Sequence, residues 1–205
     1  MARQLGKVSG GAAAAGASKQ PSFSLAALWG VLGVVAVLGN AIRRLFPIAL
    51  EPFGKAGAAG AAGGAFTPAL WAQYAGFALF MAYAEGYKGF QLKFSPLVVK
   101  RALLLGPQSP LLHKLLAAPY SMGLFHASKK RKIVSWGLAI GIVGLVKLVK
   151  GLAYPYRSIV DAGVVVGLSY GALSIVAIYA KALLSGAAPD VDPALPEAAA
   201  AGKKA

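Results

Sequence analysis

Four long apolar segments constrain this chain more than any other feature of its sequence. Residues 25–42 carry only Asn40 as a strongly polar interruption, and comparable runs cover residues 69–84, 133–149 and 159–184. A helix needs about 17–25 predominantly apolar residues to cross the hydrocarbon core of a bilayer. The pattern therefore predicts an all-α integral membrane protein with about four transmembrane helices.

The composition agrees with a multi-pass membrane protein. Hydrophobic residues make up 58% of the 205 residues and charged residues only 13%, whereas soluble domains contain roughly 45–50% apolar and about 25% charged residues. The chain has no cysteine, which excludes disulfides, thiolate metal sites and a cysteine nucleophile.

We expect residues 23–185 to form a single four-helix transmembrane domain between two disordered tails. Residues 1–22 are rich in Ala, Gly and Ser, and residues 186–205 contain three prolines; neither segment can bury enough apolar surface to offset the entropy of ordering. The Gly- and Ala-rich residues 51–66 predict a flexible connection. An organelle targeting sequence remains an alternative for the first tail, because no acidic residue precedes Glu51.

The loop between the second and third spans, residues 85–132, is strongly basic. Two Ser-Pro pairs within it are helix-start signals, and they predict short helices over residues 96–105 and 110–118. In the second of these, four leucines share one face, while His113 and Lys114 lie opposite. We therefore expect two interfacial helices in the loop, the second lying flat on the membrane.

Basic residues of this loop predict contacts with anionic lipid headgroups, each worth about 1 kcal/mol near a charged leaflet. A basic run directly before a span is better explained as a topology anchor than as a nucleic-acid site, so no nucleic acid is expected as a partner. The residues expected to contact headgroups are Lys100, Arg101, Lys114, Lys129, Lys130, Arg131 and Lys132.

The distribution of basic residues predicts an orientation. Fifteen of the 21 basic residues fall in the two tails and the central loop, if Lys181 at the end of the fourth span is counted with the second tail, and four spans would place all of these on one side. Basic loops stay on the cytoplasmic side. Both termini should therefore face the cytoplasm, or the matrix or stroma of an organelle, although Arg43 and Arg44 locally favour the reverse. The sequence does not identify which membrane holds the protein.

Glycines at regular spacing predict faces for close helix packing. Because lipid offers little hydrophobic gain for helix association, small residues that let backbones approach are favoured at membrane helix contacts. The predicted packing glycines are Gly137, Gly141 and Gly144 in the third span and Gly163, Gly167 and Gly171 in the fourth. The alternative explanation is that glycine is simply frequent in membrane helices.

Two carboxylates lie at the predicted ends of spans. Asp161 has Arg157 one helical turn before it, and Glu85 has Lys88 three residues after it. A carboxylate inside a membrane span suggests a functional site. These spacings, however, favour local pairing at the interface. The first pair is a candidate intramembrane ion pair.

His113 and His126 are the only histidines. They have no acidic neighbours that would complete a metal site, so no metal and no cofactor is predicted. A single axial histidine nevertheless suffices for haem or chlorophyll, so both residues stay open as ligands of such a pigment. A basic interfacial position explains them equally simply.

These features favour a non-catalytic integral membrane protein, an accessory, structural or assembly subunit that packs with other subunits or with itself. If the complex is energy-transducing, the sequence does not distinguish a respiratory assembly from a photosynthetic one. The main alternative is a small transporter or channel that uses Asp161 and Glu85. A lipid-acting enzyme that uses His126 is a third hypothesis, but no nucleophile or second base accompanies that residue.

Overall fold

The computed structural model describes residues 22–54 and 66–196, and every regular element in these two ranges is helical. The all-α prediction is confirmed at this level. In chain order the elements are α1 (Leu25–Ala49), the 3-10 helix η1 (Glu51–Phe53), α3 (Pro68–Met81), the π-helix η2 (Ala82–Phe94), α4 (Ser95–Ala102), α5 (Leu111–Leu115), α6 (Ala117–Ser121), α7 (Lys129–Lys150) and α8 (Tyr156–Ser185).

Three helical segments are long and apolar enough to cross a membrane: Leu25–Phe53, Lys129–Lys150 and Tyr156–Ser185. They include the first, third and fourth predicted spans, and they make the chain compatible with a multi-pass integral membrane protein. The first helix runs past residue 42, where we expected it to end, because Pro47 is accommodated inside it. Proline removes one backbone donor, and a membrane helix can tolerate that loss.

The second predicted span and the first predicted interfacial helix are parts of one rod. Helices α3, η2 and α4 follow each other without a break from Pro68 to Ala102. The Ser-Pro pair marks the change from π to α geometry, but it does not interrupt the rod. The Ser95 hydroxyl does not cap the helix. It instead shares a hydrogen bond of 2.6 Å with Ser174 Oγ on α8.

The predicted helix over residues 110–118 is also different in the structure. It divides into α5 and α6 at Leu116, whose φ of −96° and ψ of 38° leave the helical region, and α6 continues to Ser121. The leucines of the predicted apolar face are 43–71% exposed: Leu111, Leu112, Leu115 and Leu116.

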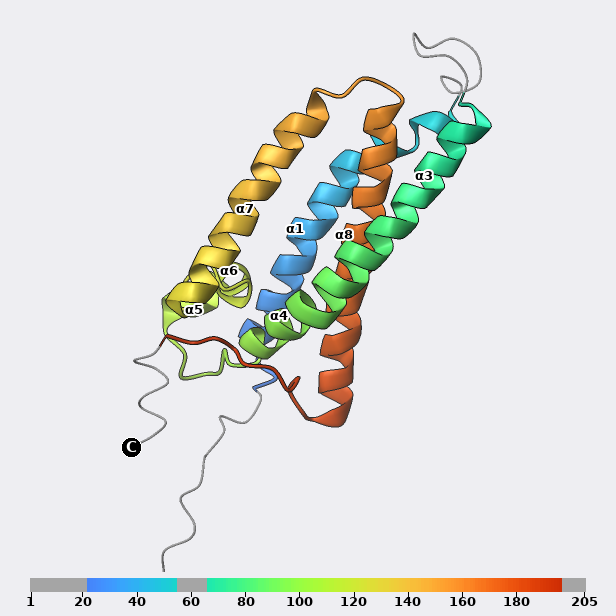
Figure 1. Ribbon diagram of the computed structural model, residues 1–205. Helices are drawn as coiled ribbons and strands as arrows, with labels where there is room; N and C mark the ends of the chain where they lie inside the picture. The colour runs from blue at the N-terminus through green and yellow to red at the C-terminus, as the bar shows by residue number, and fades with distance from the viewer. Residues whose placement is uncertain (1–21, 55–65, 197–205) are drawn as a thin grey trace, which may run out of the picture.

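Helix α8 lies between α1 and the rod (Figure 1). The largest buried cluster joins Val34 of α1, Val98 of α4 and Ile175 of α8, all with no exposed surface. Helix α7 stands beside this three-helix core, and only Ser135 and Val149 of its residues are buried.

The glycines of α8 allow the rod to approach closely. An ideal β-carbon at Gly163 would lie 2.5 Å from the Phe77 ring, and one at Gly171 would lie 2.5 Å from the Phe90 ring. The glycines of α7 differ, because added β-carbons at Gly137, Gly141 and Gly144 meet nothing within 4 Å in the described part of the chain. Packing through the α7 glycines therefore stays a prediction.

The carboxyl-terminal segment is not disordered over its described residues, contrary to our expectation. Residues 186–196 cross the α4 end of the bundle (Figure 1), where Pro193 O accepts a hydrogen bond from Arg101 Nη1 at 2.7 Å. Ser128 N also donates to Ala194 O at 2.8 Å. The sequence suggested disorder because its composition is polar and proline-rich, but backbone carbonyls supply the contacts. Residues 1–21 and 197–205 lie outside the described ranges.

Candidate functional site: a polar row along α8

Three of the six acidic residues in the chain lie on or against one helix, α8. These are Glu51, Glu85 and Asp161. The same row continues toward α4 through two hydrogen-bonded pairs, Tyr170 with Gln91 and Ser95 with Ser174. Polar groups at a helix interface in lipid are costly, and they mark functional positions more often than exposed charges do. We therefore treat this row as the candidate site.

The first part of the row lies near the start of α8. Ser158 Oγ donates a hydrogen bond of 2.8 Å to Glu51 Oε2, which brings the loop carboxylate onto the helix. One turn further, Asp161 is only 2% exposed, and its Oδ2 stands 3.7 Å from Arg157 Nε. The Arg157–Asp161 pair that the spacing predicted is thus present, although at a distance too long for a strong hydrogen bond.

Glu85 lies deeper in the bundle than its sequence position suggested. A β-carbon added at Gly167 would stand 2.7 Å from Glu85 Oε2 and 3.2 Å from its Cδ, so the carboxyl group occupies the space that this glycine leaves. Glu85 Oε2 is inaccessible to solvent and has no hydrogen-bond partner among the described residues.

The expected pairing of Glu85 with Lys88 does not occur. Lys88 Nζ lies 4.8 Å from the centroid of the Tyr83 ring, and Lys88 itself is exposed. The reason is helix geometry: the π-helix changes which residues share a face, so a spacing of three no longer brings two side chains together.

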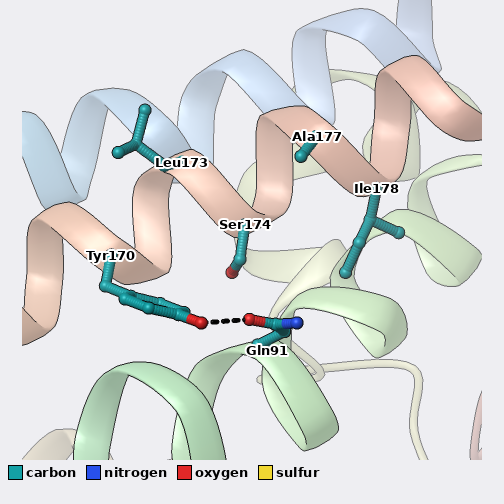
Figure 2. Close-up of a pocket in the computed structure, with 6 residues that line it drawn as sticks. All are labelled: Gln91, Tyr170, Leu173, Ser174, Ala177 and Ile178. Carbon is teal, nitrogen blue, oxygen red and sulfur yellow. Dashed lines mark hydrogen bonds between the residues drawn. The ribbon is translucent and has the colours of Figure 1, made fainter. Parts of the chain in front are cut away.

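A groove of about 290 Å³ opens beside the last part of the row. Tyr170 and Gln91 lie at its polar side and are joined by a hydrogen bond from the tyrosine hydroxyl to Gln91 Oε1 (Figure 2). Leu173, Ala177 and Ile178 supply its apolar wall. Such a lining fits an apolar chain better than a charged metabolite.

The row carries protonatable groups but no metal centre. Within residues 22–54 and 66–196, no three side chains of the His, Asp and Glu types lie close enough to hold a metal ion. The sequence singled out Asp161 with Arg157 as its partner, but it did not indicate the Glu51–Ser158 and Gln91–Tyr170 contacts, because their partners are 107 and 79 residues apart.

A second cluster lies at the α4 end and surrounds Arg101. This side chain is completely buried, and its guanidinium donates hydrogen bonds to the backbone carbonyls of Tyr120, Phe125, His126 and Pro193 at 2.7–3.2 Å. It also lies 4.6 Å from the Tyr120 ring centroid. Burial lowers the pKa of Arg101 from its ordinary value. Arg101 therefore organises the loop, and the expectation that it contacts lipid headgroups is wrong.

The other basic residues expected to contact headgroups are accessible to different degrees. Lys129, Lys130 and Lys132 are exposed at the start of α7, and Lys100 and Lys114 are partly exposed. Lys114 Nζ donates to Pro107 O at 2.6 Å. Arg131 is partly buried, and its Nη2 lies 3.5 Å from Met122 O.

The two histidines come together although they are 13 residues apart. The ring centroids of His113 and His126 are 4.4 Å apart, and both rings stack on Tyr120. Burial, and then the charge of Arg101, lower the pKa of His113. A pair of imidazoles is too few for a structural metal site, and a pigment bound to either histidine stays a prediction.

Comparison with known protein families, with curated proteins and with solved structures finds no match to this chain. The class that the fold defines is an all-helical protein with three helices suited to crossing a membrane. Any functional conclusion must rest on the residues of this chain itself.

Proposed function

We propose that the protein is a non-catalytic, multi-pass membrane protein that serves as an accessory, structural or assembly subunit of a larger membrane complex. If that complex is energy-transducing, both a respiratory and a photosynthetic assembly stay open. The observation that carries this proposal is that α7 contributes little to the buried core of its own chain.

Helix α7 is held to the rest of the chain mainly near its ends. Ser135 Oγ donates to Met122 O at 3.0 Å and Trp136 Nε1 donates to Leu124 O at 2.9 Å, while Val149 is buried at the other end. Between them, Leu138, Ile140 and other apolar side chains are at least 39% exposed. Three glycines with open space beside them make this stretch suited to close contact with another transmembrane helix.

Four membrane crossings are part of the proposal, with the rod of α3, η2 and α4 as the fourth. Helix α3 has 14 residues, about 21 Å at 1.5 Å per residue, so part of η2 must complete the crossing. Ser22 N donates a hydrogen bond to Leu103 O, and Pro193 O accepts one from Arg101. Both ends of the described chain thus lie at the α4 end, as an even number of crossings requires.

At that end, we propose that α5 lies in the membrane interface with Leu111, Leu112 and Leu115 toward the acyl chains. Lys129, Lys130 and Lys132 would contact anionic headgroups there. The positive-inside rule then places this end on the cytoplasmic, matrix or stromal side.

The topology can be tested by cysteine labelling, because the chain contains no cysteine of its own. Single cysteines at Gly54 and Ser109 test opposite ends of the bundle: Gly54 N donates to Glu51 O beside the start of α8, and Ser109 Oγ donates to Leu104 O just after α4. An impermeant maleimide applied to sealed membranes should label only one of the two. Labelling of both from the same side would overturn the four-crossing arrangement.

The subunit function can be tested by native purification in mild detergent. Gly141→Leu on α7 should abolish the recovery of stoichiometric partner subunits, or of a homo-oligomer, without lowering the yield of the protein itself. Gly39→Leu is the matched control, because Gly39 also lies on an apolar helix with open space around it. A wild-type protein that purifies as a bare monomer, or equal partner recovery from both variants, would refute the proposal.

A small transporter or channel is the second candidate function. The specific observation in its favour is Glu85, which faces Gly167 about 17 Å along α8 from Tyr156 at 1.5 Å per residue. This position is well inside a helix that could span the bilayer, whereas the sequence placed Glu85 at a span end. Loss of transport activity in an Asp161→Asn, Arg157→Gln double variant with normal abundance and normal partners would favour this candidate.

A further inference from the structure

We propose that Glu85 is a proton-binding site inside the helix bundle, and that it is occupied by a proton at neutral pH. The site is formed by the π-helix η2 on one side and by Gly167 of α8 on the other. The inference depends on this helix interface and not on a partner of α7, so it can fail or succeed independently of the subunit function.

On its Gly167 side, the carboxyl group packs tightly against α8, and its Oε2 is inaccessible to solvent. The Gly167 position lies 2.7 Å, 3.2 Å and 3.3 Å from Glu85 Oε2, Cδ and Cβ, measured from an ideal β-carbon. On the neighbouring turn, Gly86 lies equally close to Tyr170, with 2.8 Å to its Cβ. Two glycines on opposing helices thus allow η2 and α8 to approach closely at Glu85, and a β-carbon at either position would clash.

Among residues 22–54 and 66–196, no lysine or arginine forms an ion pair with Glu85. On α8, the nearest charged residues in sequence to Gly167 are Asp161 and Arg157, and these two already face each other. On the rod, Lys88 is turned toward Tyr83. The phenol of Tyr170 donates to Gln91, so it is not directed at Glu85.

A proton is the ligand that suits such a site. A bound metal cation would need several oxygen ligands around it, and the described residues contain no cluster of three or more acidic or histidine side chains. An ionised carboxylate without a partner is strongly disfavoured at membrane depth. Protonation converts the carboxylate into a neutral carboxylic acid, adding one proton and no other atom, and it needs no second group.

Other polar side chains lie further along the same interface. Tyr170 and Gln91 lie one turn further toward α4, and beyond them Ser95 and Ser174 share a buried hydrogen bond. A groove lined by Gln91, Tyr170 and Ser174 lies beside these groups (Figure 2).

The experiment is infrared spectroscopy of the full-length protein in phosphatidylcholine bilayers at about pH 7. An ordinary glutamic acid, with a pKa near about 4.3, is ionised at that pH, so it contributes no protonated carboxyl band. We expect one such band per chain in the wild type. It should be lost in Glu85→Gln and kept in the matched control Glu51→Gln.

Isotope labelling makes the test independent of whether the variant folds. Glutamate labelled with ¹³C at its side-chain carboxyl should shift the band in the wild-type protein, and labelled aspartate should leave it unchanged. Any one of three results would overturn the proposal. The wild-type spectrum could lack the band at about pH 7, the band could move with labelled aspartate, or it could survive in a folded Glu85→Gln variant.

Discussion

Arg101 Nη1 donates a hydrogen bond of 2.7 Å to Pro193 O, which joins the end of the rod to a carboxyl-terminal residue 92 positions away. The same guanidinium also holds the carbonyls of Tyr120, Phe125 and His126. One buried side chain thus connects α4, the loop before α7 and the segment after α8. The fixed fork of guanidinium donors suits this function, because a lysine ammonium cannot reach the same set of acceptors.

Replacing Arg101 should loosen three segments together. We expect Arg101→Met to lower the free energy of unfolding by about 3 kcal/mol, because one buried carbonyl and three partly buried ones lose their donor and an unsatisfied buried group costs about 1–3 kcal/mol. Arg101→Lys should recover only a small part of this loss. Thermal unfolding in detergent measures the effect, and limited proteolysis should show faster cleavage within residues 186–196. Lys100→Met is the control; an equal loss there would contradict the special position of Arg101.

Alanine substitutions at two glycines of the same rod should change the stability of the protein in opposite directions. A β-carbon at Gly86 would lie 2.8 Å from Tyr170 Cβ and Cγ, atoms close to the α8 backbone, whereas one at Gly76 meets nothing within 4 Å. Gly86→Ala should destabilise the protein by about 1–3 kcal/mol, the usual cost of overpacking. Gly76→Ala should be neutral or stabilising by up to about 1 kcal/mol. Similar melting temperatures for the two variants would argue against tight packing of η2 on α8.

The Arg157–Asp161 pair should show coupling between its members. Removing only Arg157 leaves a carboxylate that is 2% exposed without its one cation. Arg157→Gln should therefore destabilise the protein by about 1–3 kcal/mol more than the double variant Arg157→Gln, Asp161→Asn. A double-mutant cycle on unfolding free energies measures the coupling. Strictly additive effects would mean that Arg157 and Asp161 do not interact across their separation of 3.7 Å.

Acid should weaken the loop around the histidines. Burial and the charge of Arg101 lower the pKa of His113 in the folded protein, so the unfolded chain binds more protons in mild acid. Stability from this residue is present above the ordinary histidine value of about 6.5 and is lost as the pH falls below it, down to the lowered folded pKa. Melting temperatures measured across this range should fall on acidification, and His113→Gln should reduce the slope. An unchanged slope in the variant would exclude His113 as the cause.

The sequence by itself determined the local features of the fold. Apolar length identified the helices that could cross a membrane, and cap residues marked where helices begin: Ser24 Oγ accepts from Ala27 N, and Thr67 Oγ1 accepts from Leu70 N. The spacing of four also brought Arg157 to Asp161. These relationships lie within one helical turn, so composition and spacing are sufficient to predict them.

Only the tertiary structure decided which distant residues meet. It buried Arg101, although the sequence predicted that this residue contacts lipid headgroups, and it joined residues 186–196 to that side chain through Pro193 O. It also placed Glu85 against Gly167, because the π-helix changes the direction of side chains along the rod. Such contacts depend on the register between helices that are some 80 residues apart, and register is fixed by packing across the whole interface rather than by any local pattern.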